Sequence, residues 1–438
     1  MATTDLQTSE FEQRTMRKLT WKLMPLLCAC FMAAFLDRVN VGFAKEQMMK
    51  DLEFSTQVYG LGAGIFFIGY FLFEVPSNLI MERVGARMWI ALIMIVWAFI
   101  SGAMLFVKSV TVFYVLRFFL GAAEAGFFPG VIFYLTFWFP KQYRSRTVAL
   151  FMSAAVFSGV IGNPMSGALL ELDGIMGWHG WQWLFFIEAL PSLLLGIVVL
   201  AVLPNGPAQA KWLTQEEKDF VINKISAEGK DTEKHESVLK AFADPRVLLL
   251  SAIYFLSIVG AYGLDFFMPT LIKGAFGGSN TQVGFLAAVP PLLALVAMNL
   301  WGRSSDRRQE RKFHVAAAIA WAGTGLMLAS LPVPPVVALI ALAFAVAGRW
   351  SAIAPFWGLS TAFLSGRAAA GAIALINSIG NLGGFAGPYL MGWLKDTTGD
   401  YVIGLRVLAG LMFVSAALAL TIKIKREQPA VVQAAAAE

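Results

Sequence analysis

Six charged residues interrupt apolar stretches that are long enough to cross a membrane. They are Asp37, Arg38, Arg117, Glu124, Asp265 and Arg349. A charge at the middle of a membrane helix costs about 3 kcal/mol on insertion scales, so six would cost about 15–20 kcal/mol together. That exceeds the net stability of many domains. These side chains must therefore pair or face a water-filled cavity, and such groups usually mark the path of a ligand or an ion.

Arg38 and Arg117 have the chemistry to bind a carboxylate, because each guanidinium presents a flat fork of hydrogen-bond donors. Measured from the midpoints of their apolar stretches, both lie about 9–10 Å toward the same membrane surface. Glu124 follows Arg117 by seven residues, which places both on one helix face. The small residues in "GAAEAGFFPG" around Glu124 leave space for a ligand. The pattern favours an anionic ligand.

Glu124 and Asp37 are the carboxyl groups that could carry protons at such a site. The proton affinity of a buried carboxyl responds strongly to neighbouring charge, and arginines lie close to both in the sequence. A structural alternative is that Asp37 and Arg38 pair with Glu124 and Arg117 only to hold helices together. We favour the functional interpretation, because ionisable groups that cluster deep in a membrane are mostly functional.

Asp265 and Arg349 leave two interpretations open. They could pair with each other across two helices and neutralise each other. Alternatively, Arg349 binds a second carboxylate of the ligand, and Asp265 contacts a hydroxyl or cationic group and contributes to specificity.

The composition places these residues in an α-helical membrane protein. The chain has 438 residues, of which 58% are hydrophobic and 14% charged, whereas soluble proteins carry about 25% charged residues. Apolar runs of 18 or more residues are typical of membrane-spanning helices. No cleavable signal is visible in the polar first 20 residues. We predict twelve spans, at 21–43, 58–81, 87–107, 110–138, 145–170, 181–203, 247–271, 282–302, 313–331, 335–364, 368–393 and 402–424.

The long polar connection at 204–246 divides the spans into two groups of six. It contains "LTQEEKDFVINKI", in which Thr214 and Glu217 form the pattern of a helix capping box. We therefore expect a surface helix in this linker. The predicted organisation is a tail at 1–20, a six-helix bundle at 21–203, the linker at 204–246, a second bundle at 247–424 and a tail at 425–438.

Positive charges predict the orientation of the spans. Of the 34 lysines and arginines, 25 lie on the side that holds both termini and the linker, six lie on the opposite side, and three lie within spans. The positive-inside rule then places both termini and the linker in the cytoplasm.

The two groups of six also repeat each other. Glu82 and Asp306 stand at equivalent places in two charged loops and are 224 residues apart, and Pro164 and Pro388 are separated by the same interval. A recurrent offset indicates a duplicated six-helix unit, which is the plan of many secondary transporters.

Several motifs resemble the major facilitator superfamily. "NLIMERVGARM" and "GRSSDRRQERK" are similar to its signature loops, although Asn78 and Gln309 stand where glycine is usual. "FFIGYFLFEVPSN", "RFFLGAAEAGFFPG", "GWQWLFFIEALPSLLLG" and "INSIGNLGGFAGP" resemble its anion:cation symporter branch. That branch includes bacterial carriers of tartrate, sugar acids and hydroxyphenylacetate. The resemblance covers residues 20 to 424, and it implies the all-α major facilitator fold of two pseudo-symmetric six-helix bundles.

The resemblance also implies roles for particular residues. The matching acids, Asp37 and Glu124, would carry protons, and the matching bases, Arg38 and Arg117, would hold the substrate. Further substrate contacts would come from Tyr70, Trp357, Ser360, Thr361, Asn377 and Asn381, with close helix packing as the alternative role of Asn381. Glu74 and Glu188 would make contacts between helices or at a gate. The charged loops would act in gating through Glu82, Arg83, Arg87, Asp306 and Arg307.

We therefore expect a transporter that imports a small organic acid, such as a tartrate-like hydroxy acid or a sugar acid, by proton symport with alternating access across the inner membrane. An aromatic carboxylate symporter and an organic-anion exchanger or exporter are the alternatives. An enzyme is not expected, because the sequence shows no metal or nucleophile motif. The two cysteines are two residues apart on one helix and so point away from each other, which predicts no disulfide. We expect no cofactor, no metal and no nucleic-acid partner, and a monomer in contact with membrane lipid.

Overall fold

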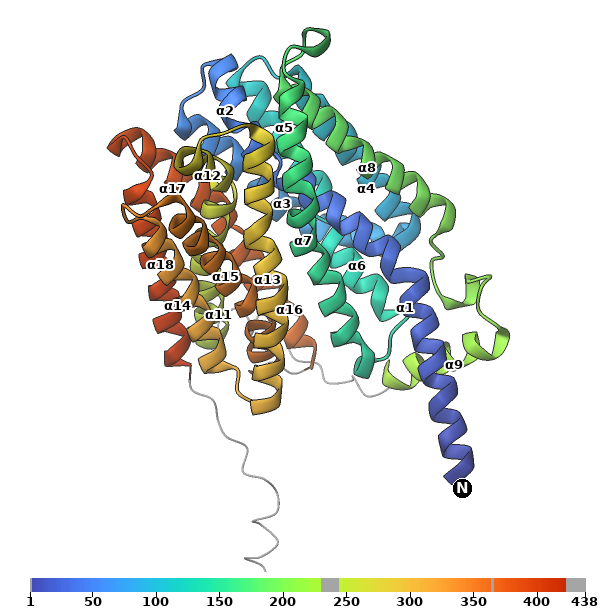
Figure 1. Ribbon diagram of the computed structural model, residues 1–438. Coiled ribbons are helices and arrows are strands. Elements are labelled where there is room, and N and C mark those ends of the chain that lie inside the picture. The colour runs from blue at the N-terminus through green and yellow to red at the C-terminus, as the bar shows by residue number, and fades with distance from the viewer. Residues whose placement is uncertain (1, 230–243, 364–365, 423–438) are drawn as a thin grey trace, which may run out of the picture.

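The computed structural model describes residues 2–229, 244–363 and 366–422, and this part of the chain consists of helices joined by short turns and loops, without strands (Figure 1). The predicted C-terminal tail at 425–438 and much of the predicted linker lie outside the described residues.

The N-terminal half of the described chain contains eight helices. They are α1 (Ala2–Val39), α2 (Val41–Leu52), α3 (Thr56–Val84), α4 (Ala86–Ala103), α5 (Val110–Glu124), α6 (Phe127–Thr136), α7 (Lys141–Leu169) and α8 (Gly180–Val202). Single 3₁₀ turns lie at Met104–Phe106, Leu170–Leu172, Ile175–Gly177 and Pro207–Gln209.

The linker helix α9 (Gln215–Gly229) follows, and it begins at the predicted capping box. The Thr214 N–H donates to Glu217 Oε2 at 2.9 Å, and the Glu217 N–H donates to Thr214 Oγ1 at 3.2 Å. Lys18 of α1 also binds Glu217, at 2.7 Å. The helix α1 therefore extends from the first predicted span into the predicted tail at 1–20, and this extension packs on α9.

The C-terminal half contains the remaining described helices. They are α11 (Pro245–Asp265), α12 (Met268–Phe276), α13 (Asn280–Arg308), α14 (Lys312–Ala329), α15 (Pro335–Phe363), α16 (Gly366–Asn381), α17 (Gly383–Thr398) and α18 (Val402–Thr421).

Eleven helical stretches of the described chain are long and apolar enough to cross a membrane, and they correspond to eleven of the predicted spans. The predicted span at 368–393 is wrong as a single helix, because it is divided at Leu382 into α16 and α17. Close packing against α11 accompanies the break. A Cβ atom on Gly383 would lie 2.5 Å from the carbonyl oxygen of Phe255 in α11, so only glycine permits this approach.

Three other predicted spans are interrupted near their charged residues. The first predicted span of the chain changes from α1 to α2 at Asn40, two residues after Arg38. The fourth changes from α5 to α6 directly after Glu124, and the seventh changes from α11 to α12 directly after Asp265. At the first two of these breaks Asn40 and Ala125 keep helical backbone angles, and Glu10–Leu52 and Val110–Thr136 are each one continuous candidate span. The breaks are therefore local irregularities, and they lie beside charged side chains in the membrane region.

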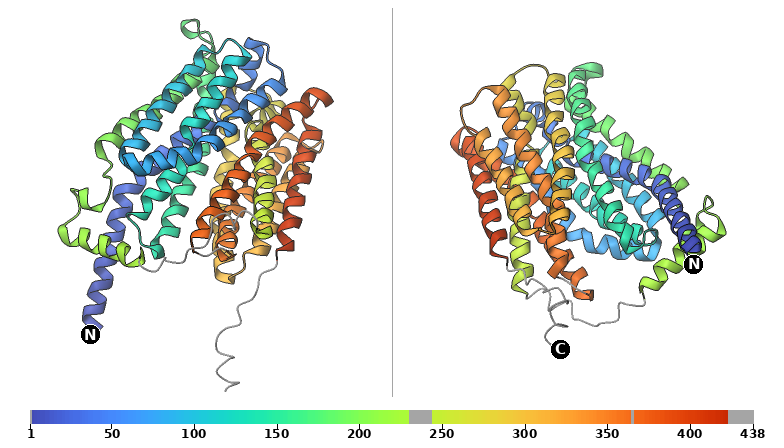
Figure 2. Two further views of the ribbon diagram at one scale, coloured as in Figure 1. Left: turned by 180° about the vertical axis from the view of Figure 1, so that it is seen from behind. Right: turned by 60° about the horizontal axis from the view of Figure 1, so that its bottom comes forward.

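The two halves lie side by side, and their ribbons diverge toward the end where the N-terminus and α9 lie (Figures 1 and 2). At the opposite end α2 packs on α12, and along the interface α3 packs on α17 and α7 on α13. Glycines allow these approaches: a Cβ atom on Gly60 would lie 2.4 Å from the Pro388 carbonyl oxygen. Small residues at helix interfaces are typical of membrane bundles.

Hydrogen bonds join the halves at the end where α2 meets α12. The Tyr59 hydroxyl lies 3.1 Å from the carbonyl oxygens of both Val41 and Phe266, so it bridges the two interrupted helices. The Gln57 N–H donates to Asp396 Oδ2 at 2.7 Å. This end of the molecule is therefore held closed.

Candidate functional site

Arg38 and Glu124 form an ion pair where the two halves meet. Arg38 lies in the last turn of α1, and Glu124 is the last residue of α5. The Arg38 Nη2 and Nε atoms lie 3.0 and 3.3 Å from Glu124 Oε2. The Arg38 Nη1 atom donates to the hydroxyl of Tyr262, on α11 of the other half, at 3.4 Å. The Arg38 side chain keeps 12% of its surface exposed, whereas Glu124 is fully buried. A ligand would therefore reach Arg38 first.

Aromatic rings of α3 hold the Arg38 guanidinium in place. Its central carbon lies 5.2 Å from the ring centres of both Phe66 and Tyr70, which is within cation–π range. Tyr70, predicted as a substrate contact, is thus beside the ion pair and is itself buried.

Arg117 departs from its predicted place. Its side chain is fully buried, and it donates to backbone carbonyl oxygens of α3, to Gly62 at 3.3 Å and to Ala63 at 3.2 Å. It does not pair with Glu124, and no ligand can reach it in this conformation. The cause is the close packing of α3 on α5, because a Cβ atom on Gly121 would lie 1.8 Å from the Phe66 carbonyl oxygen. That packing brings the α3 backbone within reach of the guanidinium.

Asp37 is directed into the N-terminal half, away from Arg38. Its carboxyl oxygens accept hydrogen bonds from Ser101 Oγ at 2.7 Å, from Trp97 Nε1 at 3.2 Å and from Ser192 Oγ at 2.5 Å. Consecutive residues of an α-helix diverge by about 100°, so neighbours in the sequence cannot share a partner here. Asp37 is fully buried and makes no ion pair with an arginine in the described chain, so the alternative of a structural ion pair does not hold for Asp37.

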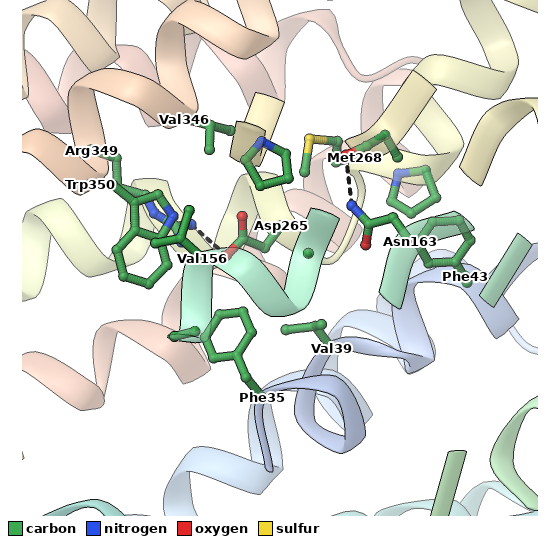
Figure 3. Close-up of a pocket in the computed structure, with 15 residues that line it drawn as sticks. Phe35, Val39, Phe43, Val156, Asn163, Asp265, Met268, Val346, Arg349 and Trp350 are labelled. Atoms are coloured by element: carbon green, nitrogen blue, oxygen red, sulfur yellow. Dashed lines mark hydrogen bonds and ion pairs between the residues drawn. The ribbon is translucent and has the colours of Figure 1, made fainter. Parts of the chain in front are cut away.

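Asp265 and Arg349 bind each other, as the first of the two interpretations states. Arg349 also donates to the carbonyl oxygen of Ala261 at 3.2 Å, and its guanidinium lies 4.8 Å from the ring centre of Trp350. Both members of the pair line a pocket between the halves, drawn in Figure 3.

The pocket combines this neutral ion pair with apolar and aromatic walls. In Figure 3 Phe35 of α1 lies across it from Trp350 of α15, and their ring centres are 6.1 Å apart. The residues that line it come from α1, α2, α7, α11, α12, α13 and α15, and are Phe35, Val39, Phe43, Ala155, Val156, Gly159, Asn163, Asp265, Met268, Pro269, Ala287, Pro291, Val346, Arg349 and Trp350. Phe35 and Val39 of α1 line it, whereas Arg38 and Glu124 are not among its lining residues.

Comparison with known proteins decides the family. The model of the Major Facilitator Superfamily matches residues 26–388 and, in a second match, 250–437. The chain belongs to the major facilitator superfamily. It is 51% identical over 428 residues to a protein of Agrobacterium vitis named "Putative tartrate transporter", covering 97% of this chain and 94% of that protein. It is 46% identical over 417 residues to "Putative metabolite transport protein NicT" of Pseudomonas putida, covering 93% and 94%.

A solved structure shows the same fold. A bacterial homologue of the human lysosomal transporter Spinster, in an inward-facing and occupied conformation, superposes with a TM-score of 0.73 at 17% identity. The match covers 91% of this chain and 96% of that one. The predicted major facilitator fold with twelve spans in two bundles is confirmed, with the eleventh span formed by α16 and α17 together.

Other residues predicted for this major facilitator site lie farther toward the end where the halves diverge. Asn377 Nδ2 donates to Glu74 Oε1 at 2.8 Å and so joins α16 to α3 across the two halves. This geometry matches the expected inter-helix role of Glu74, and Asn377 is engaged by protein. Asn381 is the last residue of α16, directly before the break at Leu382.

The predicted contacts on α15 are bonded within their own helix. The Ser360 hydroxyl donates to the Phe356 carbonyl oxygen at 2.9 Å, and Thr361 donates to that of Trp357 at 3.0 Å. Trp357 packs edge-on against Tyr254 of α11, with ring centres 5.3 Å apart. None of these three residues lines the pocket of Figure 3.

The charged loops of the superfamily each contact their own half. Arg87 Nε donates to the Leu200 carbonyl oxygen at 2.6 Å, and Arg311 pairs with Asp306 at 3.1 Å. The other predicted gating residues, Glu82, Arg83 and Arg307, are exposed. Their part in gating stays a prediction.

The sequence alone did not predict two residues at the interface between the halves. Tyr262 contacts Arg38, but a tyrosine within an apolar run carries no distinctive signal. Lys45, counted as a loop residue, is 2% exposed and donates to the Tyr401 hydroxyl at 2.6 Å and to Thr270 Oγ1 at 3.3 Å. Its ammonium also lies 4.8 Å from the ring centre of Phe267. Its position two residues beyond the first predicted span, at 21–43, could have indicated burial.

Proposed function

We propose that this protein imports a small organic acid anion together with protons, by alternating access, across the inner membrane of a bacterium with both termini in the cytoplasm. The observation that carries the proposal is the Arg38–Glu124 ion pair, which lies between the halves and is open to a ligand only at Arg38. The relative named as a tartrate transporter supports a hydroxy acid or sugar acid as the substrate.

The ion pair suggests how the acid and the proton are coupled. A substrate carboxylate binds best by taking the donors of Arg38 that Glu124 now occupies. Glu124 would then lose its ion-pair partner, and its Oε1 atom already has no hydrogen-bond partner in the described chain. A buried carboxylate without a partner costs several kcal/mol, so Glu124 takes up a proton. Release of the acid restores the ion pair and expels the proton.

The pocket of Figure 3 offers a place for the remainder of the substrate. Arg349 and Asp265 can donate to and accept from hydroxyl groups without adding net charge. The rings of Phe35 and Trp350 are the observation that favours the second candidate, an aromatic carboxylate. A hydroxy acid or sugar acid would contact the Arg349–Asp265 pair, whereas an aromatic acid would contact the rings of Phe35 and Trp350.

Alternating access follows from the arrangement of the halves. Contacts made by Tyr59 and Lys45 close the end formed by α2 and α12, while the ribbons diverge at the end with both termini (Figure 2). With the termini in the cytoplasm this conformation faces inward. The outward-facing state then requires these contacts to break and new ones to form at the other end.

Uptake into proteoliposomes tests the proposal. Labelled tartrate, a sugar acid and an aromatic acid would be offered with an acidic exterior, and with the pH gradient collapsed as the control. The proposal predicts accumulation of one class above its external concentration only with the gradient. Exchange of internal for external acid without gradient-driven accumulation would instead indicate an exchanger, and no movement of any acid would reject the proposal.

A further inference from the structure

Asn163 of α7 is held at the wall of the pocket by a hydrogen bond between the two halves. Its Nδ2 atom donates to the carbonyl oxygen of Ala287 in α13 at 2.6 Å. Pro291 lies four residues after Ala287 and has no N–H, so α13 itself supplies no donor to this oxygen at the usual helical position. A carbonyl oxygen only accepts hydrogen bonds, so the carboxamide must turn its NH₂ group toward it. The bond therefore determines which way the Asn163 carboxamide faces.

This orientation leaves the carboxamide oxygen of Asn163 free. The oxygen has no hydrogen-bond partner in the described chain, and it keeps accessible surface where the side chain lines the pocket. Figure 3 draws the bond of the amide nitrogen as a dashed line and shows the oxygen turned away from it. Asn163 thus presents one hydrogen-bond acceptor to the pocket.

Asp265 presents a second acceptor to the same pocket. Its ion pair with Arg349 uses the Oδ2 atom, whereas the Oδ1 atom has no hydrogen-bond partner among the described residues and also keeps accessible surface. The pair is neutral as a whole and contains the only charged residues that line this pocket, so no net negative charge is present to bind a cationic group. Two acceptor oxygens without donors are satisfied best by a ligand that brings neutral donors.

We propose that Asn163 and Asp265 accept hydrogen bonds from hydroxyl groups of the substrate, so that the pocket selects a polyhydroxylated acid. The inference rests on the proposed function, because it takes the transported acid as the occupant of the pocket. An ionised carboxylate has only acceptors and an aromatic ring has no donor, so neither satisfies these oxygens. An acid without hydroxyl groups would leave them desolvated and unpaired, which weakens its binding. The rings of Phe35 and Trp350 then serve as apolar walls.

Binding of acids of equal length to the purified protein tests the inference. Isothermal titration would compare tartrate, malate and succinate, which carry two, one and no hydroxyl groups, and would compare galactarate with adipate as a longer pair. We expect affinity to rise about 10-fold for each hydroxyl group that meets an acceptor. Aspartate, which carries an ammonium group in place of the malate hydroxyl, should bind no better than succinate.

Asn163→Leu removes one acceptor and should lower the preference for the hydroxylated acid of each pair about 10-fold. Loss of the bond to Ala287 alone would change the affinity for both acids equally, so the ratio separates recognition from structural support. Asn163→Ala is the second variant in case leucine prevents folding, and Tm monitors both. Asn299→Leu is the matched control, because the Asn299 amide also donates to a carbonyl oxygen of α13, that of Leu295, but does not line the pocket. It should keep the ratio of the wild type.

Equal affinity of the wild type for hydroxylated and unhydroxylated acids would overturn the inference, as would a preference that is unchanged in the folded Asn163 variants. Tighter binding of aspartate than of malate would also overturn it, by assigning the pocket to an ammonium group. In each of these cases proton-driven uptake of an acid would leave the proposed function standing. A wild type that binds and transports none of the acids, aromatic acids included, would reject the proposed function and this inference together.

Discussion

Arg38 and Glu124 contact each other at 3.0 Å although they are 86 residues apart and belong to different helices of the same half. Both lie at helix ends, and the third partner, Tyr262, comes from the other half. Under the proposed function, a ligand that binds Arg38 would act on Glu124, the proposed proton carrier, and on the contact between the halves at once. The proposal therefore links substrate binding, protonation and motion through the Arg38 side chain.

Replacing Arg38 by lysine should weaken binding of the substrate about 10- to 100-fold, since hydrogen bonds to charged groups contribute about 1.5–3 kcal/mol. Lysine keeps the charge but cannot form two parallel bonds to a carboxylate. Isothermal titration with the transported acid would measure the loss, with Tm as the control for folding. Affinity equal to that of the wild type in a folded variant would exclude Arg38 as the carboxylate ligand.

In the Glu124→Gln variant, the neutral glutamine mimics a permanently protonated Glu124. The variant should still bind the acid and exchange labelled for unlabelled acid, because Arg38 remains. It should lose uphill accumulation driven by a pH gradient, since the empty carrier can no longer release a proton. Binding, exchange and accumulation would be measured in proteoliposomes. Retained pH-driven accumulation would make Asp37 the essential proton carrier instead.

Arg117→Lys should act on stability more than on affinity. The sequence favoured Arg117 as a second carboxylate ligand, but its Nε and Nη2 atoms donate to the carbonyl oxygens of Gly62 and Ala63, and its Nη1 atom is buried without a hydrogen-bond partner in the described chain. Lysine cannot reach both, and a buried charge that loses its partners is strongly destabilising. We expect Tm to fall by several degrees, about 2–4 °C per kcal/mol lost, while the folded fraction keeps its affinity. An unchanged Tm with lost binding would restore the original interpretation.

The sequence could predict the spans and the charged residues, because the bilayer sets the length of apolar runs and makes each buried charge conspicuous. It could not predict the partners of Asp37 and Arg117. The direction of Asp37 differs from that of Arg38 by about 100°, and nothing local says which of the two side chains faces the other half of the protein. The partner of Arg117 depends on how closely α3 and α5 approach, which the glycines permit but do not specify. The Asp265–Arg349 pair was foreseen as one of two alternatives.

The contact between α1 and α9 should depend on pH. Burial disfavours the charged form of Glu217, but hydrogen bonds from Lys18 and from the Thr214 N–H outweigh it, so the pKa of Glu217 is lowered. Such a group stabilises the folded contact at pH values above its ordinary pKa of 4.5, and the stabilisation is lost as the pH falls through the lowered value. The α1–α9 distance, measured between spin labels, should therefore increase only below pH 4.5.

Lys18→Met should loosen the same contact already at neutral pH, and circular dichroism would confirm that the helices are retained. A distance in this variant that matches the wild type at neutral pH would show that the ion pair does not hold α9 in place.

The most direct test of the coupling is the proton count on substrate binding. The transported acid would be added to the purified protein in a weakly buffered solution near neutral pH, and the change in pH recorded. If the substrate displaces Glu124 from Arg38, the wild type should take up about one proton for each acid bound, and Glu124→Gln should take up none while still binding. Binding without proton uptake in the wild type, or equal uptake in the variant, would contradict the account.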